Sequence, residues 1–133
     1  MKVMGIVCIG PDPSVCVMDN GKILSMHEEE RITRIKHANV DFPKKALEYC
    51  LKQSGITIEE IDAIAYPWDA RKFSSGYIKK FYDSISNVYN KDDRTLEWEK
   101  EQIKTFNEDS LRERILSEVK NLYPKANSLP EVV

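Results

Sequence analysis

Two stretches near the N-terminus carry the residue types that could do chemistry. Asp12 and Ser14 lie in a turn between two apolar runs. A carboxylate, a hydroxyl and backbone N–H groups would therefore lie close together at the turn of a hairpin. Exposed N–H groups and a hydroxyl can hold an anion, such as a phosphate or an acyl oxygen. Asp and Ser are also ordinary turn residues. The turn alone therefore has two interpretations, a ligand site or a plain turn.

The second stretch is a dense charge block. Three carboxylates in Glu28-Glu29-Glu30-Arg31 are followed by Arg34, Lys36 and His37. Adjacent carboxylates repel one another unless cations lie nearby. The block follows a predicted strand, and functional sites gather at such strand ends. His37 could act there as a proton shuttle or a ligand. The alternative interpretation is a solvated charge run.

The elements that would position these residues begin with a strand meander. Residues 1–9 form a mostly apolar run, residues 15–18 a second and residues 22–27 a third. Asn20-Gly21 is a strong hairpin signal, because both residues readily adopt positive φ. The pattern predicts two antiparallel strand pairs, one closed by residues 10–14 and the other by Asn20-Gly21.

A helix and a fourth strand are predicted next. Pro43 suits the first turn of a helix, and Gly55 is a natural stop. Residues 57–60 resemble a short helix start with carboxylates at the positive end of the dipole, and residues 63–66 predict a fourth strand. The expected fold is therefore α/β, with the order βββαβ. The buried stripe of the helix is expected at Ala46, Leu47, Cys50 and Leu51.

The second half of the chain is predicted to be helical. One helix is expected over roughly residues 75–89 and another around Leu111, Ile115, Val119 and Leu122, with a weaker segment between them. Residues 131–133 suggest the beginning of a further strand. We assign residues 1–68 to the βββαβ core and residues 69–133 to a helical extension of the same domain. The aromatic side chains of the extension, expected to be buried against the sheet and not to face a partner, are Tyr77, Phe81, Tyr82, Tyr89, Trp98 and Phe106.

Composition excludes several classes of protein. The chain has 133 residues, with 20 Lys and Arg against 22 Asp and Glu. A near-neutral charge argues against a nucleic-acid binder, and no apolar run approaches the ~18–20 residues that a membrane span needs. The three cysteines (8, 16 and 50) have no CxxC spacing, which predicts buried, reduced thiols in the cytoplasm.

The combined strings at residues 9–23, 28–37 and 42–43 resemble the N-terminus of the carbamoyltransferase family of the NodU/CmcH type. That family opens with a strand, a His-Asp-x-Ser/Ala-like turn and an Asp-Gly hairpin. A strand ending in Glu-Glu-Glu-Arg, an Arg-x-Lys-His element and a Phe-Pro pair follow. The resemblance covers roughly residues 3–66, about half of the chain.

This resemblance implies an ASKHA-type, RNase H-like lobe joined to a C-terminal YrdC-like domain. It also implies a reaction in which carbamoyl phosphate and ATP form a carbamoyl-adenylate, with a divalent metal nearby. The carbamoyl group then passes to the hydroxyl of a small-molecule acceptor. Mapped onto the family elements, Asp12 and His37 are the expected catalytic residues. The expected substrate- and nucleotide-binding residues are Ser14, Glu30, Arg31 and Lys36.

Two departures from the family pattern shape the remaining expectations. Pro11 stands where the family has a His that could act as a general base. His27 and His37 lack HxxxH spacing, so the metal ligands are expected outside this chain. We therefore expect an incomplete N-terminal fragment, excised or naturally truncated, that is inactive without the rest of the enzyme. Its open sheet edge also predicts self-association. The alternative is a non-catalytic binding or assembly module that has lost the base at Pro11.

Overall fold

The computed structural model describes residues 1–10, 12–38, 42–84, 101 and 106–133. The chain divides into two compact units. The first contains residues 1–67 together with 115–133, and the second contains residues 68–114. Each unit is described by itself.

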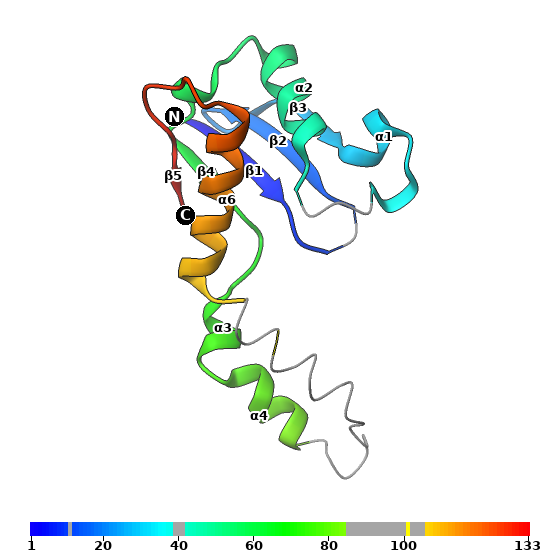
Figure 1. Ribbon diagram of the computed structural model, residues 1–133, viewed down its shortest axis with the longest axis vertical. Coiled ribbons are helices and arrows are strands. Elements are labelled where there is room, and N and C mark those ends of the chain that lie inside the picture. Colours follow the sequence, from blue (N-terminus) through cyan, green and yellow to red (C-terminus); the bar gives the residue numbers. More distant parts are fainter. Residues whose placement is uncertain (11, 39–41, 85–100, 102–105) are drawn as a thin grey trace. The chain divides into compact units, whose positions relative to one another are not determined.

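A five-stranded sheet forms the centre of the first unit, in the spatial order β3-β2-β1-β4-β5 (Figure 1). The meander pairs antiparallel, β1 with β2 and β2 with β3, whereas β4 lies parallel to β1 and β5 parallel to β4. These pairings confirm the predicted meander, the crossover to a fourth strand and the terminal strand. The strands are β1 (Lys2–Val7), β2 (Ser14–Asp19), β3 (Lys22–Glu28), β4 (Ala63–Ala65) and β5 (Glu131–Val132).

Two turns form where the sequence predicts them. Asn20 and Gly21 connect β2 to β3 with φ values of 47° and 81°, as the tight hairpin requires. Gly55 ends α2 (Lys44–Ser54) in the left-handed conformation, with φ 67°, and its N–H bonds back to the last turn. Both positions favour residues that accept positive φ.

The charge block contains helical structure that the sequence analysis did not predict. Residues Glu29–Thr33 form α1, and Lys36–Ala38 form a 3-10 turn, η1. Both lie between β3 and α2, so the order is not a simple βββαβ. Glu and Arg have good helix propensity, but a run of charges lacks the apolar periodicity that reveals a helix in a sequence. The predicted short helix at residues 57–60 is confirmed as a 3-10 turn, η2 (Ile58–Glu60).

The hydrophobic core of the first unit lies between one face of the sheet and two helices. These are α2 and the part of α6 (Glu108–Leu122) that begins at Ile115. Fully burying one aliphatic side chain contributes about 1.5–3 kcal/mol. The predicted stripe of α2 is confirmed, and the core side chains include Met4, Ile6, Val15, Val17, Leu47, Cys50, Ile64, Ile115 and Val119. None of the three cysteines, all of them described, forms a disulfide.

The second unit contains α3 (Arg71–Ser74), α4 (Tyr77–Ser84) and the beginning of α6. Trp68 packs edge-on against Phe106, with ring centroids 5.9 Å apart. The predicted burial of the aromatic stripe is wrong for Tyr77 and Phe81, which are 61% and 53% exposed. These two residues are one helical turn apart and share one face of α4. The end of the expected helix, with Tyr89, and most of the weaker segment after it, with Leu96 and Ile103, lie outside the described residues, as does Trp98.

Among the described residues, none of the helices combines the length and the apolar character that crossing a membrane requires.

A buried carboxylate connects the charge block to α2. Glu29 is only 3% exposed. Its Oε1 accepts a hydrogen bond from the backbone N–H of Lys45 (3.1 Å), and its Oε2 accepts one from that of Ala46 (2.6 Å). The first N–H groups of a helix have no partner within the helix, and the positive end of its dipole favours a negative charge. Glu29 therefore satisfies the N-terminus of α2 from outside that helix.

Replacing this carboxylate should destabilise the chain strongly. Glu29→Ala removes two charge-assisted hydrogen bonds and leaves two N–H groups unsatisfied, so we expect a loss of about 2–3 kcal/mol in the free energy of unfolding. Glu28→Ala is the matched control. It breaks only an exposed ion pair with Arg31 and should cost less than about 1 kcal/mol. Urea denaturation of both variants measures the difference, and equal losses would contradict this role of Glu29.

Candidate functional site

The structure brings Asp12, Glu30 and His37 into one cluster. Asp12 lies in the β1–β2 connection, Glu30 in α1 and His37 in η1. One possible ligand atom from each lies within 4.8 Å of the others. Asp12 Oδ1 is 3.0 Å from His37 Nδ1, and Glu30 Oε2 accepts a hydrogen bond from the His37 backbone N–H at 2.8 Å. One carboxylate therefore orients the imidazole ring, and the other holds its backbone.

The contact with Asp12 determines which nitrogen of His37 can accept a proton. An ionised carboxylate can only accept hydrogen bonds, so Nδ1 carries the proton that is donated to Asp12. The lone pair of neutral His37 is therefore on Nε2. The side chain is 59% exposed, and Nε2 has no hydrogen-bond partner among the described residues. The hydrogen bond to Asp12, then its negative charge, raises the pKa of His37.

Left-handed backbone is concentrated around this cluster. Asp12 (φ 60°), Arg34 (φ 61°), His37 (φ 59°) and Ala38 (φ 31°) all have positive φ. Only a few per cent of non-glycine residues adopt this conformation, and Asp and His are among those that tolerate it best. Such backbone persists where the surrounding contacts hold it, and it is enriched at functional sites. The contacts here are those of Asp12 and Glu30 with His37.

The three adjacent carboxylates of the charge block have three different partners. Glu28 accepts a hydrogen bond from Arg31 Nε at 3.0 Å, Glu29 binds the N-terminus of α2, and Glu30 binds His37. Arg31 also lies 3.6 Å from Glu30, so it belongs to the edge of the cluster. The predicted mutual repulsion is thus relieved in two ways: Arg31 lies between Glu28 and Glu30, and the backbone N–H groups of α2 satisfy Glu29.

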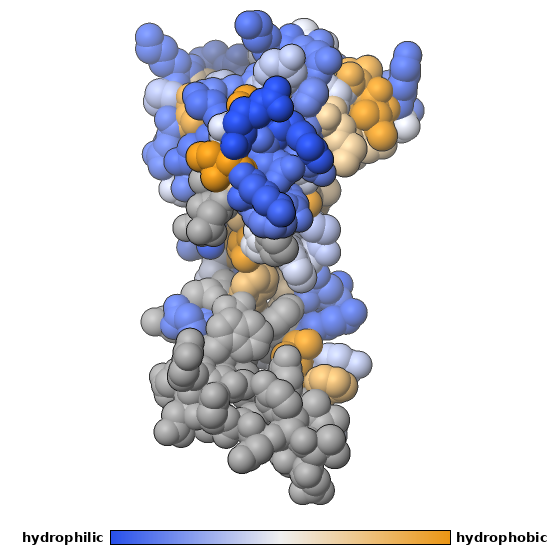
Figure 2. Space-filling view, turned by 90° about the vertical axis from the view of Figure 1, so that its right-hand side faces the viewer, coloured by the Kyte–Doolittle hydropathy of each residue, from blue (hydrophilic) through white to orange (hydrophobic). Residues whose placement is uncertain are grey.

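Two cations of the charge block remain available to a ligand. Arg34 and Lys36 are exposed, and neither has an ion-pair partner among the residues that the structure describes. Figure 2 faces the side of the molecule where α1 is labelled in Figure 1, and its surface there is mostly hydrophilic. Free exposed cations of this kind can bind an anionic group.

The predicted site residues Ser14 and Lys36 are not part of the cluster of Asp12, Glu30 and His37. Ser14 begins β2 and lines a pocket of about 320 Å³ on the sheet, together with Cys16, Met26 and Tyr66. Within the described ranges, neither Ser14 nor Lys36 forms a hydrogen bond or an ion pair with Asp12, Glu30 or His37. Pro11 lies outside the described residues.

The cluster has a donor set that fits a divalent cation. One imidazole nitrogen and two carboxylates are common ligands of divalent transition metals. The expectation that the metal ligands lie outside this chain stays a prediction. It rests on the absence of HxxxH spacing, whereas these three donors come from three separate segments. Their approach depends on tertiary packing, and no spacing rule reveals it.

The chain belongs to the family described as Carbamoyltransferase N-terminus, which it matches over residues 2–126. It is 38% identical over 77 residues to "Nodulation protein NolNO" of Sinorhizobium fredii (strain NBRC 101917 / NGR234), covering 58% of this chain and 11% of that protein. It is 34% identical over 64 residues to "Uncharacterized protein sll1178" of Synechocystis sp. (strain ATCC 27184 / PCC 6803 / Kazusa), covering 48% of this chain and 10% of that protein.

A shorter match joins the chain to "Uncharacterized 19.2 kDa protein in syrM 5'region" of Rhizobium etli. The identity is 43% over 47 residues, covering 35% of this chain and 27% of that protein. The matched segments thus span about a tenth of the first two relatives and about a quarter of the third.

The contact between Asp12 and His37 predicts a measurable titration. In Asp12→Asn the negative charge is lost, so the pKa of His37 should fall from its raised position towards the ordinary value. NMR titration of the imidazole protons measures this pKa. The ring signals of His27, which contacts Gln53 and Tyr49, are the internal reference. An unchanged His37 titration would show that the two side chains do not interact in solution.

Proposed function

We propose that this chain is the N-terminal part of an ATP-dependent O-carbamoyltransferase with an ASKHA-type, RNase H-like lobe. The transferred group would come from carbamoyl phosphate, through a carbamoyl-adenylate, and the acceptor would be a hydroxyl of a small molecule. Membership of the Carbamoyltransferase N-terminus family supports the activity. The single structural observation that carries the proposal is the orientation of His37 by Asp12, which leaves Nε2 free to accept a proton.

In the proposed transfer step, His37 acts as the general base. Nε2 takes the proton of the acceptor hydroxyl while the acceptor oxygen forms a bond to the carbamoyl carbon. The bond between that carbon and the adenylate oxygen breaks, and AMP leaves with the electron pair. Asp12 stabilises the imidazolium that forms, because its negative charge lies 3.0 Å from Nδ1.

Other residues of the chain would bind the nucleotide. Lys36, which is exposed and has no ion-pair partner among the described residues, and Arg31 would face the negative charge of the adenylate phosphate. Ser14 would contribute its hydroxyl at the start of β2. A divalent metal at the adenylate would supply further charge stabilisation, and Asp12 and Glu30 are the carboxylates that this chain could offer to it while His37 serves as the base.

The proposal predicts a selective loss of transfer in His37→Ala. The assay follows carbamoyl transfer from carbamoyl phosphate and ATP in two proteins, the 133-residue chain and the longest open reading frame that contains it. In the longer protein, His37→Ala should lower kcat about 10²–10⁴-fold, because it removes the general base. His27→Ala removes an imidazole that binds Gln53 and serves as the matched control. Failure of the longer protein to form any ATP-dependent carbamoyl-adenylate would overturn the proposal.

The pH profile gives an independent prediction. A general base must be neutral, so kcat/KM should rise as the pH increases through the raised pKa of His37. In Asp12→Asn this rise should move to lower pH, since the pKa falls. A rise at the same pH in both proteins would assign the titration to a different group.

Pro11 favours one alternative function, a binding or assembly module without transfer activity. Pro11→His restores the residue type that the family resemblance expects at this position. If the longer protein gains transfer activity only with this substitution, Pro11 marks the loss of catalysis. Transfer by the unsubstituted protein that depends on His37 would instead exclude the alternative.

A further inference from the structure

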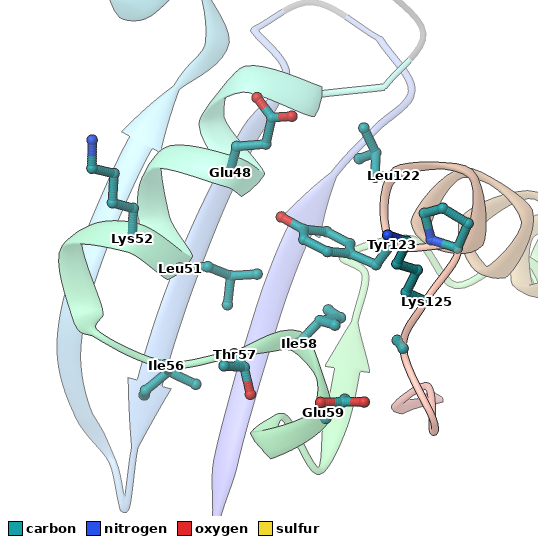
Figure 3. A pocket seen from close by; sticks show the side chains of 12 residues that line it. Glu48, Leu51, Lys52, Ile56, Thr57, Ile58, Glu59, Leu122, Tyr123 and Lys125 are labelled. Carbon is teal, nitrogen blue, oxygen red and sulfur yellow. The ribbon is translucent and has the colours of Figure 1, made fainter.

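A pocket of about 530 Å³ lies in the first unit, away from the cluster of Asp12, Glu30 and His37 (Figure 3). It is formed by the second half of α2, by η2 with the residues before it, and by the end of α6 with the loop that follows. Its volume is in the range of small-molecule sites in proteins, about 300–1,000 Å³. None of the residues that line it belongs to the candidate transfer site.

The inner surface of the pocket is apolar. Leu51, Ile56 and Ile58 are each less than a tenth exposed. The ring of Tyr123 lies across the space with its hydroxyl directed towards α2 (Figure 3). Burial, followed by the charge of Glu48, raises the pKa of Tyr123, so the phenol remains protonated near neutral pH. Among the described residues the hydroxyl has no hydrogen-bond partner, which leaves one donor inside an apolar pocket.

Four charged residues surround the opening, and their charges are not equally available. Glu48 pairs with Lys45 at 3.1 Å. Glu59 Oε1 accepts hydrogen bonds from the backbone N–H of Asn127 (2.6 Å) and from its Nδ2 (3.0 Å). Lys52 and Lys125 have no ion-pair partner within the part of the chain that the structure describes. They come from opposite sides of the pocket, one from α2 and the other from the loop after α6 (Figure 3).

We propose that this pocket binds a small molecule with an apolar body and a single carboxylate. The apolar body would contact Leu51, Ile56 and Ile58, and the carboxylate would accept hydrogen bonds from the Tyr123 hydroxyl and from Lys52 or Lys125. The inference is independent of the proposed carbamoyl transfer, because it uses other residues and a different side of the unit.

The charge distribution distinguishes this ligand from its neutral and cationic counterparts. Both carboxylates of the opening already accept bonds from the protein, whereas both ammonium groups are free to form new ones. A neutral molecule would gain only the apolar contacts. A cation would meet two ammonium groups that have no partner among the described residues, and of the two carboxylates Glu48 already pairs with Lys45 and Glu59 already binds Asn127. Charge-assisted hydrogen bonds are also the stronger kind, so the carboxylate should account for much of the affinity.

The test compares three probes that share an eight-carbon chain, namely octanoate, octan-1-ol and octylamine. Each is titrated into the ¹⁵N-labelled 133-residue chain at neutral pH, and amide shifts report both the location and the affinity of binding. We expect octanoate to shift the amides of Leu51, Ile56 and Tyr123 and to bind about tenfold more tightly than octan-1-ol. Octylamine should bind more weakly than either. Equal binding of all three probes, or no shift with octanoate at millimolar concentration, would overturn the proposal.

Variants test the roles of the polar groups. The double substitution Lys52→Gln with Lys125→Gln should abolish the preference for octanoate over octan-1-ol, and Tyr123→Phe should reduce it about threefold. Lys120→Gln, at an exposed lysine of α6 outside the pocket lining, is the matched control and should leave the preference unchanged. A preference that survives the double substitution would contradict the assigned recognition.

A second copy of the chain is the competing occupant of the pocket. It would produce shifts of the pocket amides that depend on protein concentration in the absence of any probe, together with a dimer in sedimentation analysis. That result would also overturn the proposal.

Discussion

The arrangement of the first unit near its candidate site depends on one buried contact, between the carboxylate of Glu29 and the N-terminus of α2. Glu29 N–H also donates to the backbone carbonyl of Pro13 at 2.8 Å, so the same residue contacts the β1–β2 connection. A buried carboxylate is costly unless hydrogen bonds satisfy it, and here helix N–H groups provide them. This contact therefore aligns three segments that are distant in the sequence.

The position of His37 follows from that alignment. α1 begins at Glu29, and Glu30 comes next in the same helix, so anchoring α1 also directs Glu30 towards the backbone of His37. Anchoring the Pro13 carbonyl likewise holds the connection that carries Asp12. The imidazole is thus oriented from two directions although its side chain is largely exposed. Preorganisation of this kind reduces the reorganisation that a proton transfer requires.

Much of the fold could be predicted from the sequence, because local chemistry determines it. Asn20-Gly21 specifies a hairpin. Pro43 and Gly55 mark the beginning and the end of α2, and the spacing of its apolar residues identifies its buried face. The roles of Glu28, Glu29 and Glu30 could not be predicted, since the three residues are chemically identical and only tertiary packing decides which of them is buried. Positive φ at His37 is equally hidden, because no residue type specifies it in the way that glycine does.

The family resemblance predicts Asp12 and His37 as site residues, but their contact depends on the packing of η1 beside the β1–β2 connection.

Three consecutive glutamates with three separate partners also constrain the evolution of the segment. Deleting one glutamate would preserve the acidic character of the segment. If β3 kept its register, glutamates would remain at positions 28 and 29, but an arginine would replace Glu30, whose carboxylate now holds the backbone of His37. Alignments that score only residue identity would rate such a deletion as mild, whereas its geometric effect would be severe.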